Sequence, residues 1–293
     1  ILTKDNFFDT LDKLDILLDE PMADPASVSL YFLLEEISNN GKRVVLSGDG
    51  SDELFFGYSR YREFYDIETI KKLKNKNWLK NYFRANYSMN KEWEWYKRAL
   101  EESILFRSSS ELFTDLQQNR LLKQNIKDNN SQTKLLPFWD KFIKSRRENI
   151  LDWYSFCDMK IRLGELYLKK LDIVSMACGV EVRSPFLDSS MINAAFSIDA
   201  DVKLGVSNKE LIKEIAKEYL PQSIIERKKR GFSYPFMEWL LEENSLELIK
   251  KVQNKHKIFH EDHLNFLLSK ADSGGFKNQI FAVYMYCRWL ERN

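Results

Sequence analysis

The sequence predicts a mostly helical α/β protein, and three observations support this fold class. Only 10 of 293 residues are glycine and 6 are proline, so long stretches lack helix breakers. One β-branched run, KRVVL at 42–46, leads directly into a glycine-containing loop. A helical pattern follows that loop. Strand, loop and helix in this order form the unit of a parallel sheet, whose ligands bind beyond the carboxyl ends of the strands.

Residues 1–66 contain the elements of this unit in order. Apolar residues recur at helical spacing over 5–18, and a second helical stripe ends at Gly41. The strand at 42–46 then leads through the loop SGDG into a third helix, for which Ser51 is the expected N-cap. We therefore assign these residues to the α/β sheet part of the domain.

The remainder, residues 67–293, has the pattern of a helical part of the same domain. Residues 67–150 are charged and rich in aromatic side chains, and a helix is expected over 151–170. The stretch 171–198 has the pattern of a turn, a proline break and another helix. Further helices are expected over 208–219 and in the final segment FKNQIFAVYMYCRWLER.

The composition excludes several classes of function. Lys and Arg total 45 against 44 Asp and Glu, so a net charge of +1 creates no field that would gather nucleic acid or anionic membrane. Cys157, Cys178 and Cys287 are far apart without CxxC spacing, which indicates buried thiols in a reducing compartment. No apolar run approaches the roughly 18 residues that cross a bilayer. We expect a cytoplasmic protein without nucleic-acid or membrane partners.

The segment LSGDGSDELFFGY at 46–58 is the strongest candidate site. Gly48 and Gly50 allow a tight turn and leave backbone amides uncovered where a nucleotide can approach. Three carboxylates surround the turn: Asp49, Asp52 and Glu53. Carboxylates repel bare phosphate, so either they cap the helix or a hard cation such as Mg²⁺ bridges them to phosphate oxygens. The residues alone leave both interpretations open.

Four blocks of the sequence resemble asparagine synthetase-like enzymes. LSGDGSDELFFGY is similar to the family signature LSG(E/D)G(S/A/G)DE(L/V)FGGY, except at Phe56, where glycine is usual. The other blocks are LLDEPMADPAS at 17–27, SMACGVEVRSPFLD at 175–188 and RKKRGFSYPFMEWL at 227–240. The resemblance implies an incomplete adenine-nucleotide alpha hydrolase-like (ATP pyrophosphatase) synthetase domain. Residues 1–66 would be the remaining part of its nucleotide-binding sheet.

The resemblance also implies an ATP-dependent amide-forming ligase. Such enzymes activate a carboxylate with MgATP as an acyl-adenylate and release pyrophosphate, after which an amine displaces AMP. In the asparagine-forming members the acid is aspartate, and the ammonia comes from glutamine through a glutaminase domain. ATP and Mg²⁺ are the implied cofactors, and we expect a homodimer or another form of self-association.

Residue roles follow from the same resemblance. Ser47, Gly48 and Gly50 would contact the nucleotide, and Asp52 would hold Mg²⁺ against the pyrophosphate. Asp49 stands where asparagine-forming members often have a glutamate that helps the amine lose its proton. Aspartate is one methylene shorter, which opens the choice of substrate more than the choice of reaction.

Two lysines complete the implied site. Lys229 matches the family's lysine for the α-phosphate and pyrophosphate, with Lys228 as the alternative if the register differs by one. Without the resemblance, this basic run would be a solvated face or a nucleic-acid patch. Lys209 matches a recurring family lysine at a helix start, and a surface charge explains it equally well.

Three further sets of polar residues have structural interpretations. An internal ion-pair network is expected for charges in an apolar stretch, namely Glu181, Arg183 and Asp188. Helix capping is favoured over metal contact for the acidic residues Asp19, Glu20 and Asp24. A solvated helix end is favoured over a metal site for the histidines His256, His260 and His263.

Two elements of the family do not occur in this sequence: the SGGxDS loop that wraps pyrophosphate, and an N-terminal cysteine for a glutaminase. Because the chain also begins at Ile1, we expect a fragment of the synthetase domain that is inactive alone. Two alternatives remain open. One is an amidotransferase that acts on a sugar acid, a peptide or a secondary metabolite. The other is a non-catalytic interaction module derived from the enzyme.

Overall fold

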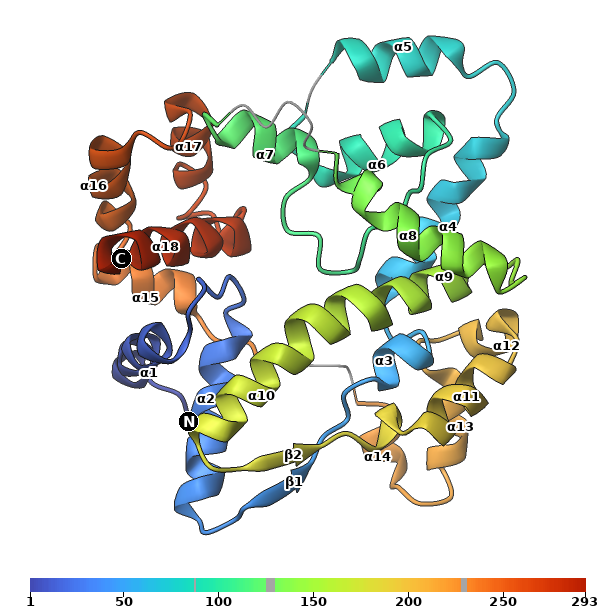
Figure 1. Cartoon of the computed structure of the whole chain (residues 1–293), viewed down its shortest axis with the longest axis horizontal. Coiled ribbons are helices and arrows are strands. Elements are labelled where there is room, and N and C mark those ends of the chain that lie inside the picture. Colours follow the sequence, from blue (N-terminus) through green and yellow to red (C-terminus); the bar gives the residue numbers. More distant parts are fainter. Residues whose placement is uncertain (87, 125–129, 228–230) are drawn as a thin grey trace.

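A computed structural model describes residues 1–86, 88–124, 130–227 and 231–293, and it is mostly helical (Figure 1). A long helical rod crosses the middle of the molecule. It consists of α9 (Ile150–Cys157), the π-helical segment η2 (Asp158–Leu168) and α10 (Lys169–Ala177). The helix predicted over 151–170 is therefore confirmed, and the rod extends one residue before it and seven beyond it.

The π-helical segment changes which side chains share a face of the rod. In an α-helix, residues five positions apart point roughly 140° apart, because each residue turns the chain by about 100°. The i→i+5 hydrogen bonds of a π-helix widen the turn, so residues five apart come together. Arg162 Nη2 accordingly donates a hydrogen bond to Tyr167 Oη at 2.7 Å. The sequence analysis contained no sign of this geometry.

The N-terminal helices form where their apolar spacing predicts them. They are α1 (Lys4–Leu17) and α2 (Ala26–Asn39). Thr3 caps α1 by accepting a hydrogen bond from the Asn6 amide at 3.3 Å. Past the end of α2, Gly41 adopts φ +71°, a conformation that favours glycine.

A two-stranded parallel sheet lies beneath the rod in Figure 1 and joins distant parts of the chain. Strand β1 (Val44–Leu46) pairs with β2 (Glu181–Arg183), with Val45 opposite Val182. The strand predicted at 42–46 is confirmed. The stretch 171–198 also contains β2, which the sequence analysis missed because three residues with exposed Glu181 and Arg183 carry no apolar run.

The region 67–150 is helical, as predicted, wherever the structure describes it. Together with α4 (Ser59–Glu68), its elements are η1 (Thr69–Lys72), α5 (Asn77–Ala85), α6 (Lys91–Leu100), α7 (Asp115–Leu121) and α8 (Ser131–Lys144). Aromatic rings form the core of this region, and those of Phe64 and Phe106 meet edge to face with centroids 5.0 Å apart.

The C-terminal part is also helical. After the short η3 (Pro185–Leu187), its helices are α11 (Ser189–Ser197), α12 (Ala200–Leu204), α13 (Glu210–Ala216), α14 (Gln222–Ile225), α15 (Phe236–Glu242), α16 (Glu247–His256), α17 (Glu261–Leu268) and α18 (Lys277–Arg292). The predicted final helix is confirmed by α18. The helix expected over 208–219 is the shorter α13.

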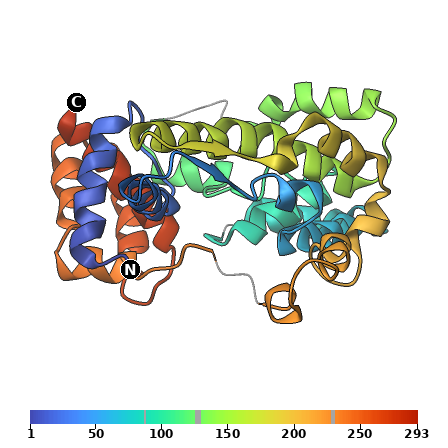
Figure 2. The same ribbon diagram turned by 90° about the horizontal axis from the view of Figure 1, so that it is seen from below.

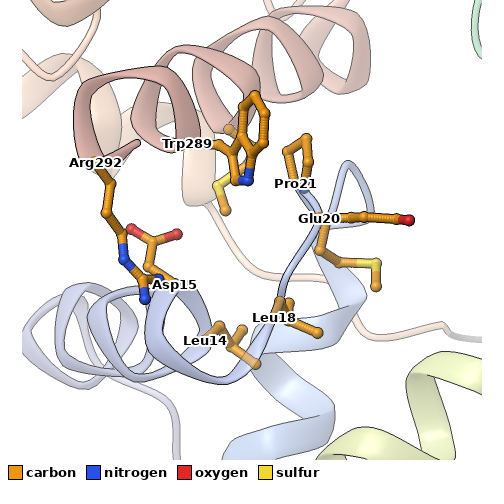
Figure 3. Close-up of a pocket in the computed structure, with 9 residues that line it drawn as sticks. Leu14, Asp15, Leu18, Glu20, Pro21, Trp289 and Arg292 are labelled. Atoms are coloured by element: carbon orange, nitrogen blue, oxygen red, sulfur yellow. The ribbon is translucent and has the colours of Figure 1, made fainter.

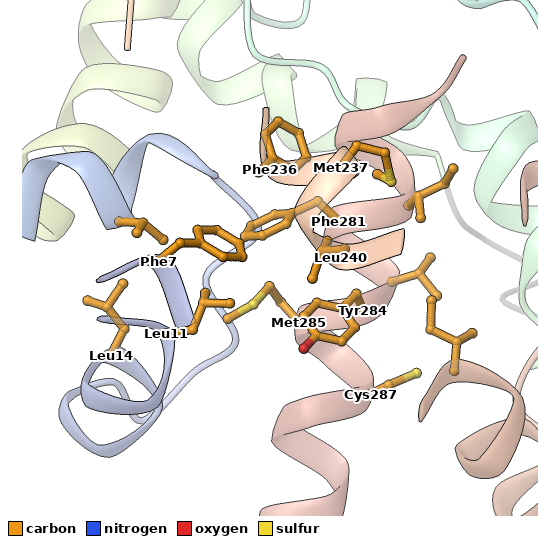
Figure 4. Packing of buried hydrophobic residues seen from close by; sticks show 14 of the residues in the cluster. Phe7, Leu11, Leu14, Phe236, Met237, Leu240, Phe281, Tyr284, Met285 and Cys287 are labelled. Carbon is orange, nitrogen blue, oxygen red and sulfur yellow. The ribbon is translucent and has the colours of Figure 1, made fainter. Parts of the chain in front are cut away.

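The largest hydrophobic core joins the two ends of the chain. Phe7 and Leu11 of α1 face Phe281 and Met285 of α18 in Figure 4. Figure 2 shows the same helices gathered at one end of the molecule, away from α11–α14. Because α1 and α18 close this core together, it depends on contacts between residues far apart in sequence.

Two of the three cysteine thiols lie in the interior of the fold. Cys157 and Cys287 are buried and Cys178 is half-buried, and all three are free. Burial raises the pKa of Cys287 to about 12, so its thiol stays protonated at neutral pH. Within the described ranges, no helix has the length and apolarity required to span a membrane.

Candidate functional site

The predicted turn lies at the carboxyl end of the parallel strands, between β1 and α3 (Ser51–Leu54). The Ser47 amide donates a hydrogen bond to the Arg183 carbonyl at 2.8 Å, which continues the pairing of the two strands. The Ser47 and Ser184 hydroxyl oxygens are 2.8 Å apart. Two of the predicted blocks therefore meet at the edge of the sheet where ligands of parallel sheets bind.

The two glycines of the turn differ in what requires them. Gly50 adopts φ +92°, and an added Cβ would lie 2.3 Å from Leu187 Cδ2. Backbone conformation and packing therefore both require glycine at this position. At Gly48, an added Cβ would meet no atom within 4 Å, so its backbone borders open space that a ligand can enter.

The helix cap differs from the prediction. Gly50, rather than Ser51, occupies the N-cap position of α3, because the left-handed turn places Ser51 as the first helical residue. The Ser51 hydroxyl donates to the Gly48 carbonyl at 2.8 Å, so it braces the turn instead of capping the helix.

Lys209 reaches this turn from a distant segment. Its Nζ lies 2.9 Å from Asp52 Oδ1 and donates to the Ser51 hydroxyl at 2.7 Å. Gly57 leaves room for the pair, because an added Cβ would lie 1.8 Å from Asp52 Oδ1 and 2.5 Å from Lys209 Cε. The structure therefore places Lys209 at the turn, and its contact with a nucleotide stays a prediction.

Asp49 is half-buried at the same turn. Its amide donates to the Ser47 hydroxyl at 3.4 Å. Its carboxylate makes no hydrogen bond or ion pair to any residue that the structure describes. A carboxylate without a partner among these residues, beside the open space at Gly48, has the chemistry of a general base.

Lys229 and its alternative Lys228 lie outside the described residues, so their placement stays a prediction. The segment that follows them is described. Tyr234 Oη donates a hydrogen bond to the Pro25 carbonyl at 2.5 Å. The block at 227–240 therefore contacts the block at 17–27, which places two more of the family blocks side by side.

A buried polar network lies on the inner side of α3. The Tyr58 hydroxyl donates to Glu53 Oε1 at 2.7 Å, and Arg162 Nη1 lies 3.5 Å from the same oxygen. The Arg162 guanidinium is sandwiched between the rings of Tyr58 and Tyr167, 4.4 Å from each centroid. Burial raises the pKa of Glu53, although the Tyr58 hydrogen bond and the Arg162 charge act in the opposite direction.

Asp158 extends this network below Tyr61. It accepts hydrogen bonds from the Tyr61 hydroxyl at 2.9 Å, the Ser108 hydroxyl at 2.9 Å and the Ser109 amide at 3.0 Å. Burial raises its pKa as well. Sequence reasoning missed Arg162 and Asp158, which lie in none of the four blocks; the structure brings Arg162 to Glu53 of α3 and Asp158 to Tyr61 of α4.

Phe56 ends α3 in a conformation usual for glycine. Its φ is +53°, and the Gly57 amide donates to the Asp52 carbonyl at 2.8 Å, which forms a Schellman motif. The Phe56 ring is buried and meets the Tyr61 ring edge to face at 5.6 Å. The buried Lys203 ammonium lies 4.7 Å from its centroid. Packing around the ring therefore compensates for the strained backbone.

The acidic residues before α2 have structural contacts. Asp24 Oδ1 accepts a hydrogen bond from the Ala26 amide at 3.0 Å, which agrees with the expected capping, although Pro25 is formally the N-cap. Asp24 Oδ2 also accepts from the buried Lys170 at 2.5 Å. Glu20 pairs with Lys169 on the surface at 3.5 Å, and the Asp19 carbonyl accepts from Trp289 at 3.0 Å.

The internal ion-pair network predicted around β2 is wrong. Glu181 and Arg183 do pair at 2.8 Å, but both side chains are exposed because they point away from the core. Asp188 is also exposed, and it caps α11 by accepting a hydrogen bond from the Ser190 amide at 2.8 Å. In the short strand, inward Val182 fills the core and its charged neighbours face solvent.

The three histidines lie at helix ends, as expected. His256 is in the last turn of α16, His260 is the N-cap of α17, and His263 follows in its first turn. In the part of the chain that the structure describes, no group of three or more His, Cys, Asp or Glu side chains is placed to hold a metal ion. A metal at Asp52 would therefore need phosphate and water ligands, as Mg²⁺ commonly has.

A small hollow between α1 and α18 lies outside this site (Figure 3). Leu14, Leu18 and Trp289 line it, and its volume of about 10 Å³ holds no more than one water molecule. Packing at the junction of the termini, rather than ligand binding, accounts for it.

Comparisons with known proteins agree with the four sequence blocks. The family model described as asparagine synthase matches residues 1–291. Asparagine synthetase [glutamine-hydrolyzing] 1 of Bacillus subtilis is 27% identical over 304 residues, which cover 100% of this chain and 47% of that protein. A putative asparagine synthetase [glutamine-hydrolyzing] of Mycobacterium bovis is 28% identical over 82% of this chain and 37% of its own length. The chain thus spans about half or less of these relatives, and it belongs to the asparagine synthase family.

Proposed function

We propose that this chain contributes the second half of an ATP-dependent synthetase site, in a protein that activates aspartate as an acyl-adenylate and forms asparagine with ammonia from glutamine. One observation carries the proposal. Ser47, Asp52 and Lys209 converge at the carboxyl end of the parallel strands in a chain of this family. The names of the two relatives, which describe glutamine-hydrolysing asparagine synthetases, support asparagine as the product and glutamine as the nitrogen source.

In this proposal Asp52 holds Mg²⁺ and Lys209 and Lys229 contact the phosphates. Asp52 is a single, partly exposed carboxylate, and it suits Mg²⁺, which keeps water and substrate phosphates as its other ligands. When bound, the ion offsets the negative charge that develops on pyrophosphate as it leaves. The two lysines supply the remaining positive charge at a turn whose own charged side chains are all carboxylates.

The reaction divides into two displacements. A carboxylate oxygen of the acid attacks the α-phosphorus of ATP, and pyrophosphate leaves. Ammonia then attacks the acyl carbon and AMP leaves, while Asp49 accepts the proton released by the amine. The Asp49 carboxylate has no partner among the described residues, which leaves it available for this role.

The decisive experiment uses the full-length protein. We expect exchange of pyrophosphate into ATP that depends on aspartate, and formation of asparagine from glutamine. Asp49→Asn should retain exchange and lose amide formation, whereas Lys229→Ala should lose exchange by at least about 100-fold. Equal loss of both steps in Asp49→Asn would instead assign Asp49 to nucleotide or metal binding.

A second substrate class is supported by Asp49 itself, because aspartate replaces the glutamate common in asparagine-forming members. In this alternative the protein amidates a sugar acid, a peptide or a secondary metabolite. Exchange that depends on such an acid, without exchange on aspartate, would favour it.

The isolated chain is expected to bind MgATP weakly, because its sequence contains no SGGxDS loop to wrap the phosphates. It is also expected to self-associate, because Leu46 on β1 is 74% exposed and Val44 is 49% exposed. Calorimetric titration and light scattering test the two statements. Micromolar MgATP binding by a monomer would contradict both.

A further inference from the structure

In this structure the Asp52 carboxylate already pairs with a positively charged side chain. The Lys209 ammonium lies 2.9 Å from Asp52 Oδ1, and that ion pair occupies the side of α3 that borders the turn. A divalent ion on the same oxygen would lie within a few ångströms of the ammonium. At that distance the two positive charges repel each other, and the water that reaches this partly exposed pair weakens the repulsion without removing it.

Lys209 is held at this place by its own segment. Its backbone adopts φ +57° at the N-cap of α13, and its side chain reaches Asp52 of α3. Asn208 Nδ2 donates to the Gly57 carbonyl at 3.4 Å, and Arg62 Nη2 donates to the Gly205 carbonyl at 2.9 Å. These contacts tie the lysine's segment to the residues directly after α3.

The contacts of the ammonium are nevertheless exchangeable. Both partners of the ion pair are about one-quarter to one-fifth exposed. The second contact of the ammonium is the neutral Ser51 hydroxyl, which keeps its own bond to the Gly48 carbonyl when the lysine leaves. A partly exposed pair of this kind contributes little stability, so a polyanion beside it can draw the ammonium away.

We propose that Lys209 is a specificity-determining residue that excludes free divalent cations from Asp52 and admits the cation only together with nucleotide phosphates. Without nucleotide, the ammonium neutralises Asp52. When a metal–phosphate complex binds, the Lys209 ammonium would contact the phosphates, and the Asp52 carboxylate would then be available to coordinate the metal. The inference rests on the proposed function, in which Asp52 is the Mg²⁺ ligand.

The test measures binding of Mn²⁺ by electron paramagnetic resonance to the full-length protein, first alone and then with inorganic pyrophosphate. Lys209→Met should bind Mn²⁺ alone about two- to fivefold more tightly than the natural protein, because a competing charge is gone. Pyrophosphate should enhance Mn²⁺ binding less in this variant, by a similar factor. Loss of a lysine with only a structural role would not raise the affinity for Mn²⁺ alone and at the same time lower the enhancement by pyrophosphate.

Two control variants accompany the test. Lys217→Met removes the same charge near the end of α13, where Lys217 pairs with Glu214 on the surface at 2.6 Å, and it should change neither quantity. Lys209→Arg keeps the positive charge and should behave like the natural protein with Mn²⁺ alone.

The outcomes separate the inference from the proposed function. If Asp52→Asn abolishes Mn²⁺ binding while Lys209→Met leaves it unchanged or weaker, the inference fails and the metal assignment stands. If Asp52→Asn leaves Mn²⁺ binding intact, the metal assignment and the inference both fail. Tighter Mn²⁺ binding by Lys209→Met, in a protein that lacks exchange on any acid, would support the inference and overturn the proposed reaction.

Discussion

Asp52 and Glu53 are neighbours in one short helix, yet their carboxylates lie in opposite environments. The Asp52 side chain is 20% exposed and pairs with the flexible Lys209. The Glu53 side chain is 4% exposed and lies between Tyr58 and Arg162, whose guanidinium is enclosed by two rings. Asp52, on the outer side of α3, pairs with a partly exposed side chain that can move away, whereas Glu53, on the inner side, has partners that are fixed by burial. The same motif thus contains the proposed metal ligand, Asp52, and a buried carboxylate, Glu53, that anchors the helix.

The energetic consequences differ in the same way. Pairs near the surface are typically worth less than about 1 kcal/mol, because water and salt screen them. Removing one partner of a buried pair costs about 3–5 kcal/mol, since the other charge remains without compensation. Changes on the inner side of α3 should therefore affect stability, and changes on the outer side should affect binding and catalysis.

The largest effect is expected from Arg162→Met. The variant should lower the free energy of unfolding at pH 7 by about 3 kcal/mol, because Glu53 loses its only cationic partner among the described residues. Urea denaturation measures the change, and Arg162→Lys, which keeps a positive charge, should lose less. A loss below about 1 kcal/mol would show that the Glu53–Arg162 pair is as weak as a solvent-screened pair such as Asp52–Lys209.

Asp52→Asn tests the outer side. We expect exchange of pyrophosphate into ATP to fall by about 100-fold in the full-length protein, because the variant removes the carboxylate proposed to bind Mg²⁺. The free energy of unfolding should change by less than about 1 kcal/mol. A large loss of stability would show that the Lys209 pair is an anchor as well.

A smaller effect concerns the pH dependence of the inner carboxylate. Burial raises the pKa of Glu53 above its ordinary value of 4.5. A carboxyl whose pKa is higher in the folded state favours folding most at pH values below 4.5, and this advantage is lost as pH rises through the folded-state pKa. The stability of the natural protein relative to Glu53→Gln should therefore fall between pH 4 and 8, as urea denaturation at the two pH values can measure. A relative stability that rises with pH would show that Arg162 outweighs burial.

The smallest effect is expected from Gly57→Ala. The added methyl group would displace the ends of the Asp52 and Lys209 side chains, which are flexible, so the cost in stability should be about 1 kcal/mol or less. The separated pair should change the affinity for Mn²⁺ by a few-fold. Identical Mn²⁺ binding in the variant and the natural protein would mean that the pair does not control access to Asp52.

Local patterns predicted the strand, the turn after it and the two helices at the ends of the chain. The glycines and carboxylates of the turn follow one strand directly, so a short stretch of sequence defines them. Helices α1 and α18 are long amphipathic segments with repeated apolar residues, and such periodicity is the most readable signal in a sequence.

The inner network could not be predicted from local patterns. Arg162 lies on η2, which winds as a π-helix, and it meets Glu53 from a segment far away in the sequence, so no local pattern predicts the contact. Strand β2 was missed because three residues with two exposed charges resemble a loop. The burial expected for Glu181 and Arg183 failed for the same reason, since the alternation of the strand turns both side chains outward.

The conformation and packing of Phe56 limit which substitutions position 56 can accept during evolution. Phe56→Gly would relieve a backbone strain of about 1–3 kcal/mol but would empty a slot between Tyr61 and Lys203, where loss of an aromatic ring typically costs about 3–5 kcal/mol. Glycine and phenylalanine are thus each acceptable only beside a different set of neighbours. Substitutions at position 56 and in the slot around it are therefore expected to be epistatic, so that neither can drift without the other.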